Sequence, residues 1–171
     1  SAIRGGPTER ILDDREALRT WMTNADALNE PLSVRRHWVH RFEQDFRSGY
    51  SWQAVFDPLP VEQQHRFAAN FNELTRLMLV DKADAWYSRQ SKRREAYLDR
   101  EFADLQNWKL IGDGTSERSR RASSLLSELV RHPDRWLAGA SPEQRKRFDA
   151  FRQAVEQRTW SHELRRWLPL K

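Results

Sequence analysis

The stretch PVEQQHRFAANFNELTRLMLVDKADAWYSRQ, residues 60–90, carries apolar side chains at the spacing of an α-helix. Phe67, Phe71, Leu74 and Met78 follow one another at intervals of three or four residues, which places them on one face of a helix. Proline is common in the first turn of a helix, and Pro60 opens the stretch. The stretch therefore predicts the longest helix of the protein, from Pro60 to about Gln90.

The helical period continues on both sides of this stretch. The other predicted helices cover 7–29, 33–48, a short turn at 52–56, a helix that starts behind Ser91 and reaches Trp108, 116–131, a segment opened by Ser141 and a short last helix at 160–167. Gly49 is the predicted stop of the second helix, because glycine readily adopts the left-handed conformation found there. No alternating run bounded by hairpin turns occurs, so no sheet is predicted. We predict an all-α fold, a compact irregular bundle of about six to eight amphipathic helices.

The length and composition suit one soluble helical domain. The chain has 171 residues, of which 38% are hydrophobic, and we predict a single domain over 1–171. Gly112-Asp113-Gly114 is the best linker, so 112–114 is the candidate hinge between 1–111 and 115–171. No transmembrane segment is expected, because no apolar run reaches about eighteen residues. The chain begins Ser-Ala-Ile, without Met, so we expect an upstream export signal or membrane anchor.

The eight tryptophans supply much of the apolar surface that the fold can bury. Most of them fall in helical apolar stripes and are interpreted as core residues, namely Trp21, Trp38, Trp86, Trp108, Trp160 and Trp167. The alternative is an aromatic platform that stacks on single-stranded nucleic acid, which would require exposed rings in a basic groove.

Basic residues gather where helices are predicted to begin. The stretches are SVRR (33–36), SKRRE (91–95), SRR (119–121) and SPEQRKR (141–147), and Ser33 and Ser91 are predicted N-caps of their helices. A helix start carries partial positive charge and should favour Asp and Glu instead. The residues that form the candidate anion- or partner-binding surface are Arg35, Arg36, Lys92, Arg93, Arg94, Arg120, Arg121, Arg145, Lys146 and Arg147.

Three explanations of these basic helix starts are open. The cations can simply be tolerated, because a serine cap contributes about 1 kcal/mol and outweighs a small dipole penalty. They can pair with nearby acids such as Asp13 and Asp99. They can also hold an anion, since free backbone N–H groups and arginines together bind phosphate or carboxylate. The net charge of +5, from 30 basic and 25 acidic residues, is modest for a nucleic-acid-binding protein.

No motif for catalysis or for a bound cofactor stands out. The absence of cysteine excludes disulfides, thiol nucleophiles and cysteine-based zinc sites. His37 and His40 would share a helix face, and Glu62-x-x-His65 occurs once, whereas metal sites need three or four ligands. The sequence contains no phosphate-binding glycine loop and no Gly-x-Ser-x-Gly. We predict no metal, no cofactor and no catalytic residue.

Two short stretches, LPVEQ (59–63) and ASPEQ (140–144), resemble a box known from another group of proteins. They are similar to the Leu-Thr-x-x-Gln box that occurs twice in small periplasmic helical stress chaperones. The resemblance covers about ten residues, and Pro60 and Ser141 stand where the box has threonine, while Ala140 stands for a leucine. It would imply an exported, helical, client-binding protein that is often dimeric.

The expected function is binding or scaffolding rather than catalysis. The partner would be another protein or an anionic polymer, held at the basic helix starts, and the oligomeric state is open. The alternative is a nucleic-acid-associated helical module. The third reading is a periplasmic chaperone-like protein or a small hydrolase.

Overall fold

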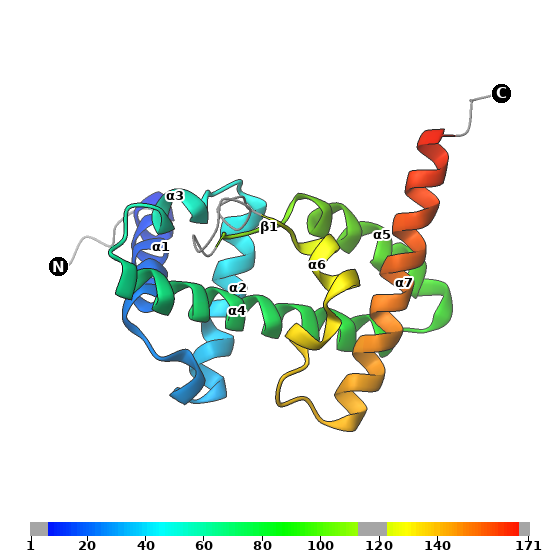
Figure 1. Ribbon diagram of the computed structural model, residues 1–171, viewed down its shortest axis with the longest axis horizontal. Helices are drawn as coiled ribbons and strands as arrows, with labels where there is room; N and C mark the ends of the chain where they lie inside the picture. Colours follow the sequence, from blue (N-terminus) through cyan, green and yellow to red (C-terminus); the bar gives the residue numbers. More distant parts are fainter. Residues whose placement is uncertain (1–6, 113–122, 168–171) are drawn as a thin grey trace. The chain divides into compact units, whose positions relative to one another are not determined.

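The computed structural model describes residues 7–112 and 123–167, and the side chains of 14–112, 124–161 and 163 (Figure 1). The described residues form seven α-helices: α1 (Pro7–Asn24), α2 (Leu32–Arg47), α3 (Trp52–Phe56), α4 (Val61–Tyr87), α5 (Ser91–Asn107), α6 (Leu125–Arg131) and α7 (Pro142–Trp167). Two 3₁₀ turns, η1 (Ala27–Asn29) and η2 (Pro133–Trp136), lie between them. The all-α prediction is confirmed. The extended backbone is a two-residue antiparallel ladder of β1 (Lys109–Leu110) with β2 (Ser123–Ser124).

Several helix ends lie where the sequence predicts them. The predicted long helix is α4, which begins directly after Pro60. Gly49 has a φ of 77° and follows α2, so the predicted stop is confirmed. The N–H groups of Gly49 and Tyr50 donate to the carbonyls of Phe46 and Asp45, which is the Schellman pattern. At the start of α7, Ser141 and Gln144 exchange hydrogen bonds between side chain and backbone, as a capping box does.

Other local predictions are wrong. Ser33 and Ser91 do not cap their helices: α2 begins at Leu32 behind Pro31, and α5 begins with Ser91 itself behind Gln90. The two helices predicted after Ser141 are one, α7. Of the helix predicted at 116–131, the described part is helical only from Leu125, because the two residues before it pair with β1.

The chain forms two compact units, and the boundary between them falls inside α4, after Met78. The first unit holds the described residues up to Met78 together with Ile111 and Gly112, and the second holds Leu79–Leu110 and the described residues from Ser123 onward. The single domain and its hinge at 112–114 remain predictions, and Asp113 and Gly114 lie outside the described residues.

The core of the first unit is aromatic. Phe42 of α2 and Phe71 of α4 are fully buried, and their rings meet edge to face with centroids 5.1 Å apart. Trp52 of α3 and Phe67 of α4 extend this cluster, with centroids 6.1 Å apart. Edge-to-face and tilted pairs of this kind add favourable electrostatics to the burial of apolar area. The long helix thus places its predicted apolar face against α2 and α3.

The second unit packs α5, α6 and α7 around the C-terminal part of α4. Its fully buried side chains include Leu105, Leu125, Phe148 and Phe151, which come from three different helices. The ring of Trp86 in α4 lies 6.0 Å from that of Phe151 in α7. Lys82 of α4 and Glu101 of α5 form a buried ion pair.

Candidate functional site

The basic start of α5 divides its cations between two roles. Lys92 and Arg93 are exposed. Arg94 instead turns back to α4: its Nε donates to the carbonyl of Arg89 at 3.0 Å and its Nη2 to that of Tyr87 at 2.5 Å. The last carbonyls of a helix lack partners within the helix and carry partial negative charge. Arg94 therefore stabilises the end of α4, which explains why a cation stands at the start of α5.

The basic start of α7 is divided in the same way. Arg145 donates from Nη2 to the carbonyl of Leu137 at 3.1 Å, which satisfies the end of η2. Arg147 lies 3.2 Å from the carboxylate of Glu143 and 3.7 Å from that of Asp84 in α4. Lys146, between them, is exposed.

These two basic starts meet at the ring of Tyr87, the last residue of α4. The guanidinium carbon of Arg94 lies 5.2 Å from the centroid of this ring, and that of Arg147 lies 5.8 Å from it. In Figure 1, α7, coloured orange to red, crosses α4 near the C-terminal end of α4. Arg145 is exposed as well, but it is held by the carbonyl of Leu137. We call the other exposed cations of these helix turns, Lys92, Arg93 and Lys146, the Tyr87 basic surface.

The basic start of α2 is used within the first unit. Arg35 lies 2.6 Å from the carboxylate of Glu73 in α4, and Arg76 lies 2.7 Å from the same oxygen. Burial by itself would raise the pKa of Glu73, but the hydrogen bonds and positive charges of Arg76 and Arg35 outweigh it and lower this pKa. Arg36 is exposed, and Arg120 and Arg121 lie outside the described residues.

The lowered pKa of Glu73 predicts a loss of stability in acid. A carboxyl group whose pKa is lower in the folded state contributes stability above its unfolded pKa of about 4.3, and this contribution is lost as the pH falls through the folded pKa. We therefore expect Glu73→Gln to be less stable than wild type near neutral pH and to lose less stability between about pH 5 and pH 3. Urea unfolding followed by circular dichroism at several pH values measures the stability near neutral pH and its change in acid for both proteins. Glu62→Gln, an exposed change on the same helix, should keep the wild-type pH dependence, and an equal slope in Glu73→Gln would contradict the prediction.

A groove that the sequence does not reveal lies in the second unit, between α6 and α7. Its volume is about 490 Å³, and Leu126 and Val130 of α6 and Trp160 of α7 contribute apolar lining. Trp160 is 60% exposed, so the prediction that it is a core residue is wrong. The sequence feature that indicates the exposure of this tryptophan is its polar neighbours, Thr159 and Ser161.

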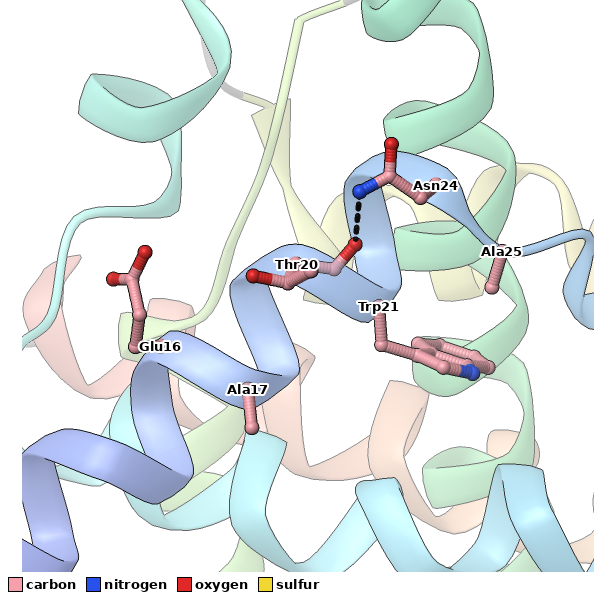
Figure 2. Close-up of a pocket in the computed structure, with 6 residues that line it drawn as sticks. All are labelled: Glu16, Ala17, Thr20, Trp21, Asn24 and Ala25. Carbon is pink, nitrogen blue, oxygen red and sulfur yellow. Dashed lines mark hydrogen bonds between the residues drawn. The ribbon is translucent and has the colours of Figure 1, made fainter.

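A second hollow, shallow and open, lies along α1 (Figure 2). Ala17, Trp21 and Ala25 form its apolar strip, and the side-chain amide of Asn24 donates to the carbonyl of Thr20 at 3.0 Å. The indole N–H of Trp21 donates to Glu30 at 3.0 Å, so this ring is held in place.

Metal-ligating side chains are scattered in the part of the chain that the structure describes. No three His, Asp or Glu side chains come together there as a metal ion would require. The ring of His37 stacks edge-on against Trp38, with centroids 4.8 Å apart, and His40 hydrogen-bonds to Gln44. Across the described helices, none has the length and apolarity to cross a membrane.

Comparison of the chain with models of protein families, with curated proteins and with solved structures gives no match. Support for the candidate sites therefore comes from the geometry of this chain alone.

Proposed function

We propose that the protein is a non-enzymatic binding domain whose Tyr87 basic surface, Lys92, Arg93 and Lys146, holds an acidic protein partner. The observation that carries the proposal is the meeting of two basic helix starts at Tyr87, where Arg94 and Arg147 are occupied with internal contacts. Lys92 and Arg93, which precede Arg94 in the sequence, and Lys146, which precedes Arg147, are exposed.

The start of α5 adds a backbone contribution. Its N-cap residue, Gln90, makes no side-chain hydrogen bond to the first turn. The first N–H groups of a helix lack partners within the helix and favour negative charge. A carboxylate that meets Lys92 or Arg93 would therefore also gain from this helix end.

The mixture of charges favours an acidic protein over nucleic acid. Glu95 and Glu143 lie in the same helix turns, and their side chains are 77% and 57% exposed. Carboxylates at these positions repel a continuous phosphate backbone, whereas a protein partner can meet both signs at separate places.

The test is the double variant Lys92→Gln/Arg93→Gln, assayed by fluorescence anisotropy with a labelled glutamate-rich peptide. We expect its affinity to fall about three- to tenfold at low salt, because each exposed charge pair contributes up to about 1 kcal/mol. The matched control is Arg66→Gln/Lys109→Gln, which removes the same charge from exposed residues of α4 and β1. This control should bind as wild type does.

The same assay separates the alternatives. Equal losses in the two double variants would mean that net charge, and not this surface, holds the peptide, and no binding of the peptide at low salt would overturn the proposal. Tighter, steeply salt-dependent binding of a labelled oligonucleotide would replace the acidic protein by nucleic acid.

A further inference from the structure

The groove beside Trp160 differs in charge from the Tyr87 basic surface. Two carboxylates of α7, Glu156 and Glu163, line it together with one guanidinium, that of Arg131 on α6. Glu156 lies four residues before Trp160 and Glu163 three residues after it, and this spacing places both on the face of α7 that carries the indole. The α7 side of the groove is therefore an exposed aromatic ring between two acids.

Glu163 is the groove carboxylate that has no ion-pair partner among the described residues. The carboxylate of Glu156 is already engaged, because Arg152 lies 3.1 Å from it. Glu163 is exposed, and no ion pair joins it to another described residue. A cation that entered the groove, which Arg131 also lines, would thus find one carboxylate with no ion-pair partner among the described residues.

Arginine is the group that this chain places over its own aromatic rings. Guanidinium carbons lie 4.4 Å from the ring centroid of Tyr50, 4.0 Å from that of Tyr97 and 4.8 Å from that of Trp136. Among the described residues no guanidinium covers Trp160, although tryptophan is the ring that attracts cations most strongly.

We propose that this groove docks an arginine side chain of a partner polypeptide, stacked on Trp160 and paired with Glu163. The apolar floor of Leu126 and Val130 would take the methylene stem, and a groove of about 490 Å³ is large enough for the whole side chain. Arginine is favoured over lysine because its planar guanidinium can stack on the indole and pair with a carboxylate at once.

The site goes beyond the proposed acidic-partner surface and does not depend on it. Lys146 and Trp160 are fourteen positions apart on α7, or about 21 Å along the helix. Variants of one site therefore leave the side chains of the other unchanged.

The experiment uses the full chain labelled with ¹⁵N and a short peptide whose only charge is one arginine, with both ends blocked. The indole N–H signal of Trp160 is identified by its loss in Trp160→Ala. We expect a saturable shift of this signal with the arginine peptide, a smaller one with the lysine counterpart and none with the glutamine counterpart.

Matched carboxylate variants test the pairing. Glu163→Gln should weaken binding of the arginine peptide about two- to fivefold. Glu62→Gln removes the same charge from an exposed position on α4 and should leave the binding unchanged.

Three results would overturn the proposal. They are no shift at millimolar peptide, an equal shift with the glutamine peptide, and equal weakening by Glu163→Gln and Glu62→Gln. A protein that is dimeric, and that becomes monomeric on Trp160→Ala, would assign the groove to a second copy of this chain and rule out a separate partner.

Discussion

Phe71→Ala should lower the free energy of unfolding by about 3 to 5 kcal/mol, among the largest effects expected of a single substitution here. Phe71 is fully buried, and its ring contacts those of Phe42 and Phe46 of α2, with centroids 5.1 Å and 5.9 Å away. Alanine would remove the ring and leave a cavity that rigid aromatic neighbours fill poorly. Urea unfolding followed by circular dichroism measures the loss.

The control for Phe71 is a second apolar side chain on the same helix. Val61 is 66% exposed at the start of α4, so Val61→Ala should change the stability by less than about 0.5 kcal/mol. A similar stability for the two variants would mean that Phe71 does not hold α4 against α2.

Asn70→Asp should cost about 3 kcal/mol or more, because a buried polar side chain would lose two of its three hydrogen bonds. The side-chain amide of Asn70 donates to the carbonyls of Met22 and Ala25, each at 2.8 Å. Its oxygen accepts from the N–H of Ala27 at 3.1 Å. One side chain of α4 thereby forms hydrogen bonds with three backbone groups at the end of α1 and in the turn that follows it. Aspartate keeps the shape, but it presents an oxygen to two carbonyl oxygens.

The matched change is Gln63→Glu, which adds the same charge to the same helix at an exposed position. It should be close to neutral, and thermal unfolding of the two variants side by side measures the difference. If Asn70→Asp unfolds at the temperature of Gln63→Glu, Asn70 does not hold the end of α1.

Local features of the helices are readable in the residues themselves. The period of Phe67, Phe71 and Leu74 predicts α4 because a helix turn brings every third or fourth side chain to one face. Gly49 marks the end of α2 because the backbone there needs a positive φ. The exchange between Ser141 and Gln144 involves residues three apart and needs no distant partner.

The predictions that fail concern segments whose structure depends on an element distant in the sequence. Leu28 belongs to the apolar period of 7–29, yet it is 67% exposed, since α1 ends at Asn24 and Asn70 of α4 binds the turn that follows. Ser123 and Ser124 pair with β1 instead of extending α6. Such contacts join residues far apart in the chain, and a local pattern does not specify them.

The basic helix starts show most clearly which features the sequence predicts and which only the tertiary structure decides. By itself the sequence determined an all-α protein, the position of its longest helix and the clustering of cations at helix starts, because periodicity, capping and composition are local properties. Tertiary structure decided the role of each cation: Arg94 ends α4, Arg35 pairs with Glu73, and Lys92 stays exposed. It also decided that Trp160 lies open beside a groove. The physical reason is that the interaction energy of a charged or aromatic side chain depends on the groups that pack against it. Only the folded chain brings those groups together.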